Sequence, residues 1–271
     1  MDLKITTVQA DLIWEDKTQN LLKFDNLLRG CTDSDIIVLP EMFTTAFSMK
    51  PEKLAEPLFS ETFKWMTEKA KELNAVVTGS FICVENQQYF NRLIWMQPDG
   101  NYFKYDKRHL FTLADENAHY TEGSERITVE WKGWRICPLI CYDLRFPVWS
   151  RNTAHFNLND KNTSAEGYYD ILLYVANWPE RRSHAWKTLL LARAIENQAY
   201  VVGVNRIGLD RNEVLHSGDS SIIDYAGNIL FQQSYTEGVH TTILSDSKLT
   251  NFRNKFGFLF DQDSFSIQTV I

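Results

Sequence analysis

Short apolar segments alternate along this chain with segments whose apolar residues recur at helical spacing. The segments that are typical of buried strands are 4–8, 36–39, 75–82, 136–140, 171–176 and 200–204. Residues 60–73 and 186–198 place apolar side chains three and four positions apart, as an amphipathic helix does. Strands that alternate with helices indicate an α/β protein rather than a helix bundle or an all-β sandwich.

Polar residues mark the borders of these segments. Ser60 and Ser183 are predicted to be the N-terminal caps of the two helices. The pair Asp99-Gly100 predicts a β-hairpin between 89–97 and 102–105, and residues 226–228 predict a second hairpin within 221–231. Because no repeat, charge block or flexible linker divides the chain, we expect a single domain over residues 1–271.

The composition excludes several classes of partner. The formal net charge of −7 argues against nucleic acid, whose binding proteins carry basic surfaces. No apolar run is long enough to cross a membrane, and the charged N-terminal segment is unlike a signal peptide. Four cysteines without paired spacing favour a reducing compartment, so we expect a cytoplasmic protein without a disulfide framework or a metal site.

Two segments stand apart from the rest of the chain. Residues 155–167 are rich in polar residues, which predicts a solvated loop. Five phenylalanines lie between positions 252 and 265, so the C-terminal segment of about 246–271 should cover its own core or another subunit. We favour a homodimer in which this segment takes part.

Three reactive side chains each follow a predicted strand. Glu41 follows 36–40, Lys107 follows 102–106, and Cys141 follows 136–140. Because the carboxyl ends of strands form the ligand crevice of an α/β sheet, these residues can converge on one pocket. Two further predicted strands end in Asn177-Trp178 and in Asn205, which would supply amide and aromatic walls.

The three residue types together suggest nucleophilic catalysis. A thiol is a weak nucleophile near neutral pH unless a base or a positive charge assists it. Glu41 can act as that base, while Lys107 can stabilise a thiolate and then, with the backbone N–H of Tyr142, an oxyanion. An amide or nitrile carbon is the natural electrophile for such a thiol.

Structural roles remain open for each residue taken alone. A free cysteine is most often buried and inert, and a single glutamate or lysine is most often a surface charge. A Cys-His dyad that uses His109 or His184 is a minor alternative. Cys137 is expected to pack in the core, because residues four apart on a strand are too distant for a disulfide with Cys141.

Three motifs around these residues resemble the carbon-nitrogen hydrolase (nitrilase) superfamily. They are Leu-Pro-Glu-Met-Phe at 39–43, Tyr-Asp-Lys-Arg-His-Leu-Phe at 105–111 and Ile-Cys-Tyr-Asp-Leu-Arg-Phe-Pro at 140–147. Longer segments, including Asn-Trp-Pro at 177–179 and Ala-Arg-Ala-Ile-Glu-Asn-Gln at 192–198, are similar to its bacterial omega-amidase (2-oxoglutaramate amidase) branch. The resemblance covers nearly the whole chain.

The resemblance implies a four-layer αββα sandwich, nitrilase-like, with a catalytic triad of Glu41, Lys107 and Cys141. It also implies a second glutamate near the thiol, and Glu116 is the candidate. The expected activity is hydrolysis of a short omega-monoamide of a dicarboxylate to acid and ammonia through a thioester, without metal or cofactor. Hydrolysis of a nitrile or an N-carbamoyl compound stays an alternative, as does a catalytically silent binding protein.

The substrate pocket is predicted from residues near these motifs. Aromatic side chains next to a nucleophile are candidate walls, and a substrate carboxylate favours a fork-shaped cation. We expect Asp143 and Arg145 to form an ion pair or to bond loop backbone below the nucleophile, without a catalytic role. The substrate-binding candidates are Phe43, Phe111, Trp178 and Arg182, and Phe47 and Tyr142 are further candidate walls.

Overall fold

Two seven-stranded mixed sheets form the centre of the computed structural model, which describes residues 1–152, 168–263 and 265–267. The first sheet has the order β14-β1-β2-β4-β5-β6, with β3 beside β4. Its strands are β1 (Leu3–Gln9), β2 (Ile36–Val38), β3 (Glu56–Pro57), β4 (Val76–Glu85), β5 (Gln88–Met96), β6 (Tyr102–Asp106) and β14 (Gly238–Leu244).

The second sheet has the order β11-β12-β10-β9-β8-β7, with β13 beside β12. Its strands are β7 (Val129–Trp131), β8 (Trp134–Ile140), β9 (Ile171–Ala176), β10 (Tyr200–Asn205), β11 (Ile207–Leu209), β12 (Leu215–Ile223) and β13 (Ile229–Ser234). All six strands predicted from apolar runs are present. Both predicted hairpins also form, as the antiparallel pairs β5·β6 and β12·β13.

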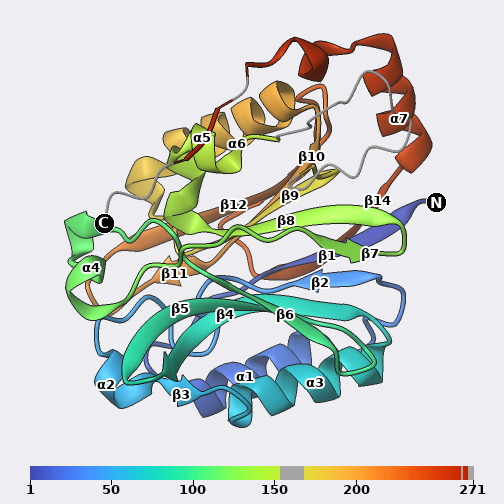
Figure 1. Cartoon of the computed structure of the whole chain (residues 1–271). Helices are drawn as coiled ribbons and strands as arrows, with labels where there is room; N and C mark the ends of the chain where they lie inside the picture. The colour runs from blue at the N-terminus through green and yellow to red at the C-terminus, as the bar shows by residue number, and fades with distance from the viewer. Residues whose placement is uncertain (153–167, 264, 268–271) are drawn as a thin grey trace.

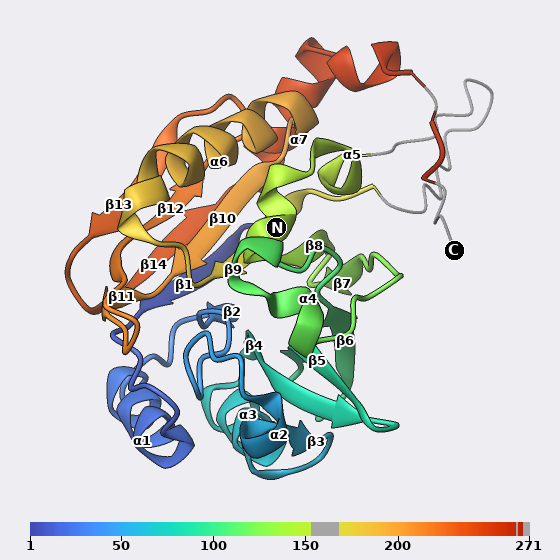
Figure 2. The same ribbon diagram turned by 90° about the vertical axis from the view of Figure 1, so that its left-hand side faces the viewer.

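Helices cover the outer face of each sheet (Figures 1 and 2). α1 (Lys17–Leu27) and α3 (Glu61–Leu73) cover the first sheet, and α6 (Ser183–Asn197) covers the second. The shorter elements are α2 (Pro51–Leu54), α4 (Glu116–His119), α5 (Pro147–Ser150), α7 (Asp246–Lys255), η1 (Thr112–Ala114), η2 (Cys141–Arg145), η3 (Glu180–Arg182) and η4 (Phe258–Asp261). The layers confirm the predicted αββα sandwich.

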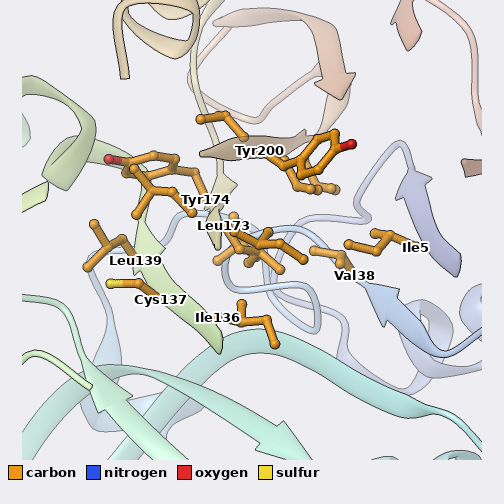
Figure 3. Packing of buried hydrophobic residues seen from close by; sticks show 14 of the residues in the cluster. Ile5, Val38, Ile136, Cys137, Leu139, Leu173, Tyr174 and Tyr200 are labelled. Carbon is orange, nitrogen blue, oxygen red and sulfur yellow. The ribbon is translucent and has the colours of Figure 1, made fainter. Parts of the chain in front are cut away.

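The larger apolar core lies between the two sheets. Ile5 and Val38 of the first sheet belong to the same buried cluster as Ile136 and Leu173 of the second. Figure 3 shows Cys137 packed in this cluster, and its sulfur is a free thiol. The prediction that Cys137 has a packing role is therefore confirmed.

One of the two predicted helix caps is confirmed in position, and the other was wrong. Ser60 is the N-cap residue of α3, although its side chain makes no capping hydrogen bond. Ser183 is the first residue of α6 rather than its cap, and its hydroxyl donates to Asp219 instead, at 2.7 Å. A tertiary partner therefore replaces the local backbone partner that the capping rule assumes.

The C-terminal segment packs on its own chain over its first part. Phe252 of α7 contacts the ring of Tyr225 with 4.6 Å between centroids, and Gln198 donates to the backbone of Phe256. Phe258 and Phe260 remain 62% and 58% exposed.

The predicted loop at 155–167 lies outside the described residues. No helix in the described ranges is long and apolar enough to span a bilayer.

Candidate active site

The carboxyl ends of three strands from both sheets meet at one edge of the sandwich. β6 runs antiparallel to β5, which is antiparallel to β4, so β6 points the same way as β2. Lys107 follows β6 directly, Cys141 follows β8 directly, and Glu41 lies three residues after β2. The three side chains therefore converge as predicted, but they come from two facing sheets rather than from one.

Lys107 lies between two buried carboxylates. Its ammonium donates to Glu41 Oε1 at 2.9 Å and to Glu116 Oε1 and Oε2 at 3.0 and 2.9 Å. All three side chains are at most 1% exposed. Burial alone would lower the pKa of Lys107, but the charges of Glu116 and Glu41 outweigh it and raise that pKa. Lys107 is therefore a permanent cation.

Glu116 opens the short helix α4 and has two roles in this geometry. Besides pairing with Lys107, its Oε2 accepts a hydrogen bond from the backbone N–H of Phe111 at 2.6 Å. Burial, followed by the nearby charge of Glu41, raises the pKa of Glu116 despite the opposing effect of Lys107. The neighbouring Asp115 is exposed and adopts a left-handed backbone conformation, so Glu116 rather than Asp115 is the second carboxylate that pairs with Lys107.

Glu41 is oriented by a donor on each side of its carboxylate. The Asn91 side-chain amide donates to Oε1 at 2.8 Å, and the backbone N–H of Asn177 donates to Oε2 at 2.8 Å. The Asn177 side chain also donates to the backbone oxygen of Glu41 at 2.5 Å. These contacts hold the carboxylate in one rotamer beside the thiol of Cys141, with which it interacts.

Cys141 lies at a sharp turn between β8 and η2. Its φ of +43° is in the left-handed region, which is strained for a residue with a side chain. Burial, followed by the charge of Glu41, raises the pKa of the thiol well above its ordinary value, although Lys107 acts in the opposite sense. The resting residue is therefore a thiol and needs a base when it attacks.

A cavity of about 210 Å³ opens over Cys141. Phe47, Phe111, Tyr142, Asn177 and Trp178 line it, as predicted. Three arginines also face it: Arg145, Arg181 and Arg182. The residues that complete the lining are Lys107, Ala114, Pro179, Asp210, Asn212, Val214 and His216.

The three arginines have no carboxylate partner within the part of the chain that the structure describes. The Arg182 guanidinium lies 5.0 Å from the ring centroid of Phe111, and that of Arg145 lies 5.0 Å from the ring centroid of Trp178. Burial, followed by repulsion from Arg181, lowers the pKa of Arg182. An anion in the cavity would relieve this repulsion.

One prediction about this region was wrong, and another was confirmed in only one of its two alternatives. Phe43 does not line the cavity, because its ring packs in the core under α1 and α3, 5.4 Å from the ring of Phe24. Asp143 and Arg145 form no ion pair. Asp143 instead accepts hydrogen bonds from Tyr105, from the backbone of Ile140 and from His109. Bonding to loop backbone, the other predicted possibility, is thus confirmed for Asp143.

Neither His109 nor His184 forms a dyad with the thiol. His109 bonds Asp143 through its ring nitrogen at 2.7 Å and stacks on Phe146, and His184 is exposed on α6. Within the described ranges, no group of three His, Cys, Asp or Glu side chains is arranged to hold a metal ion. Asn91, which lies inside β5 and orients Glu41, was not predicted to take part in the site, whereas Asn205 was predicted to line the pocket. Asn205 is instead buried behind it, where its amide bonds the backbone N–H and C=O of Trp178.

Comparisons with known proteins agree with this geometry. A family model described as carbon-nitrogen hydrolase matches residues 4–254. The chain is 47% identical to Omega-amidase YafV of Escherichia coli (strain K12), over 98% of both chains. It is 32% identical to 2-oxoglutaramate amidase of Bacillus subtilis (strain 168), over 88% of this chain and 89% of that protein.

Among solved structures, the CN-hydrolase superfamily protein XC1258 from Xanthomonas campestris superposes with a TM-score of 0.94 and 42% identity. The superposition covers 99% of this chain and 100% of that one, which carries an arsenic adduct in its active site. A carbon-nitrogen hydrolase from Helicobacter pylori shares the fold, with a TM-score of 0.85 at 19% identity over 96% of this chain and 95% of that one. With a matching family model over most of its length and a buried Glu-Lys-Cys cluster at the expected edge, this chain belongs to the carbon-nitrogen hydrolase family.

Proposed function

We propose that this protein is a cysteine-dependent omega-amidase that hydrolyses a short omega-monoamide of a dicarboxylate, of the 2-oxoglutaramate or succinamate type. The observation that carries the proposal is a buried thiol beside a carboxylate and a cation at the floor of a small cavity, which is walled by arginines without a carboxylate partner among the described residues. The relatives named for omega-amidase and 2-oxoglutaramate amidase activity support the substrate class.

The first half-reaction forms a thioester. Glu41 takes the thiol proton as Cys141 Sγ bonds to the amide carbon, and the same proton passes to the leaving nitrogen as the carbon–nitrogen bond breaks. Ammonia departs. Because burial keeps Cys141 protonated at rest, deprotonation and attack must be coupled, and the Glu41 carboxylate already interacts with the thiol.

The second half-reaction hydrolyses the thioester. Glu41 takes a proton from water as the water oxygen bonds to the acyl carbon, and the carbon–sulfur bond then breaks to release the acid and restore the thiol. Lys107 and the backbone N–H of Tyr142 stabilise the oxyanion in both halves. Lys107 suits this role because two carboxylates fix its ammonium before substrate binds.

The arginines explain selectivity for an anionic substrate. Arg182 and Arg145 each lie over an aromatic ring of the cavity, which holds the guanidinium plane without consuming its hydrogen-bond donors. A carboxylate at the end of the substrate opposite the amide would accept these donors. Arg182, our predicted contact, and Arg145 therefore form the proposed carboxylate site.

Intact-protein mass spectrometry during turnover of 2-oxoglutaramate and succinamate tests the proposal, with ammonia release followed in parallel. We expect an acyl adduct on Cys141, its loss together with all turnover in Cys141→Ala, and an unchanged adduct in Cys31→Ala. Substantial ammonia release by Cys141→Ala would refute the mechanism. Absence of both adduct and ammonia in the wild type would favour a nitrile or N-carbamoyl substrate, or a binding protein.

We also propose that the protein is a cytoplasmic homodimer. The exposed rings of Phe258 and Phe260 at the end of the C-terminal segment support a subunit contact there. The composition described above supports the cytoplasm. Light scattering at micromolar concentration should give twice the chain mass of 31.6 kDa, and a monomer would refute the dimer.

A further inference from the structure

The arginine-bearing loop between β9 and α6 is held mainly by contacts of its backbone. Trp178 Nε1 donates to the backbone oxygen of Arg182 at 2.8 Å, and Arg182 itself makes no ion pair with a described carboxylate. The position of its guanidinium therefore depends on where the loop ends and α6 begins. Ser183, the first residue of α6, is the next residue in the chain.

Asp219 of β12 anchors this junction from behind. Its carboxylate accepts hydrogen bonds from the hydroxyls of Ser183 at 2.7 Å, Ser217 at 2.6 Å and Ser234 at 2.6 Å. Its backbone oxygen accepts from Trp186 Nε1 at 2.9 Å. Asp219 therefore contacts the first turn of α6 through both its side chain and its backbone.

The local geometry shows that Asp219 is held as a carboxylate. The residue is 3% exposed and has a φ of +57° at an irregularity in the β12·β13 pairing. Although burial raises the pKa of Asp219, the hydroxyl donors from Ser217, Ser234 and Ser183 lower it below its ordinary value. A negative charge beside the first turn of a helix also interacts favourably with the helix dipole.

We infer that Asp219 is a positioning residue for substrate recognition, which acts through Ser183 to hold Arg182 over the cavity. The inference rests on the proposed function, because it assumes that Arg182 binds the substrate carboxylate. Asp219 is absent from the cavity lining, so it acts on the cavity through its neighbours, and Ser183 is the neighbour that adjoins Arg182 in the chain. Loss of the contact between Asp219 and Ser183 should therefore weaken the binding of anionic substrates and leave the chemistry at Cys141 unchanged.

The three serines allow a matched test. Ser183→Ala removes the hydrogen bond that reaches the arginine-bearing loop, whereas Ser234→Ala removes a hydrogen bond of similar length from the same carboxylate on the side of β13. The substrates are succinamate and butyramide, which share an amide and chain length but differ in the carboxylate. Both variants keep the Asp219 carboxylate and two of its three hydroxyl donors, and their thermal unfolding midpoints report any loss of folding.

We expect Ser183→Ala to raise the KM for succinamate about fivefold, the effect of one hydrogen bond, with kcat unchanged. The KM for butyramide should not change, and Ser234→Ala should resemble the wild type with both substrates. Equal effects on both substrates, or equal effects of the two serine variants, would show that Asp219 has only a structural role and would overturn the inference.

Arg182→Ala distinguishes the proposed carboxylate site from the positioning role of Asp219. If it raises the KM for succinamate while Ser183→Ala does not, the positioning role fails and the carboxylate site stands. If Arg182→Ala leaves the KM for succinamate unchanged, the carboxylate site as proposed is refuted, and the positioning inference with it. Asp219→Asn should act in the same direction as Ser183→Ala, and its thermal unfolding midpoint reports any loss of folding.

Discussion

Replacing Lys107 by methionine should destabilise the protein strongly while keeping the shape of the side chain. The ammonium is 1% exposed and makes three contacts of 2.9–3.0 Å with Glu41 and Glu116. Its loss leaves two carboxylates buried without a cation. Removing one partner of a buried ion pair costs about 3–5 kcal/mol of unfolding free energy. For a chain of this size that corresponds to a fall of about 6–12 °C in Tm.

Two further variants test whether the loss of stability comes from the uncompensated buried carboxylates. Lys104→Met removes a cation from β6, the strand that Lys107 follows, but Lys104 is 42% exposed and its pair with Glu85 should contribute at most about 1 kcal/mol. Adding Glu116→Gln to Lys107→Met removes one of the two uncompensated charges, so the double variant should recover about half of the lost stability. The assay is thermal and urea unfolding followed by circular dichroism, which needs no activity.

The pH dependence of the unfolding free energy tests independently whether buried carboxylate charge destabilises Lys107→Met. Lys107 opposes the burial that raises the pKa of Glu116, so its removal raises that pKa further. A buried carboxyl group with a raised pKa destabilises the folded state only while it is ionised. This loss of stability is therefore smallest at low pH, where the group is protonated. The stability gap between Lys107→Met and the wild type should therefore shrink as the pH falls from 8 towards 5. A Tm within about 2 °C of the wild type, a gap that does not shrink, or no recovery by Glu116→Gln would refute this reasoning.

Three more predictions concern single residues. Glu41→Gln should lower kcat for succinamate by about 10²–10⁴-fold, the contribution of a general base, and a loss below tenfold in steady-state ammonia release would contradict its role. Phe43→Ala should cost about 3–5 kcal/mol of stability because its ring is in the core, whereas Phe111→Ala should mainly raise KM; equal Tm values for the two variants would contradict the assignment. His216 is buried, and burial followed by Arg206 lowers its pKa to about 4. The unfolded state therefore binds a proton that the folded state does not bind, so stability is lost as the pH falls from about 6.5 to 4. His216→Gln should flatten this part of a plot of the urea midpoint against pH.

The strands and the reactive residues could be predicted because each depends on local pattern. Lys107 and Cys141 follow their strands directly, and the direction of a strand fixes the edge at which its last residue lies. The pairing of the strands into two sheets could not be predicted from the pattern. It came only from the family resemblance, since an apolar run carries no information on which neighbour it joins.

Phe43 and Arg145 show how a turn changes the direction of a side chain. Met42 has a φ of +43°, and this reversal sends Phe43 to the core under the helices while Glu41 faces the thiol. Residues two apart in a 3₁₀ turn point to different sides, so Asp143 faces the loop backbone and Arg145 faces the cavity. Both errors came from treating proximity in the chain as proximity in space.

Glu116 is the residue whose role depends most on three-dimensional geometry. Its carboxylate contacts Lys107, which belongs to the proposed catalytic cluster, and the backbone N–H of Phe111, which belongs to the cavity wall beneath Arg182. One side chain therefore links the position of the proposed oxyanion donor to the shape of the proposed substrate site. It follows that Glu116→Gln should change both kcat and KM for succinamate, whereas a Glu41 variant should change kcat alone. Steady-state kinetics that gave the same pattern for both glutamates would show that the link through Phe111 does not affect binding.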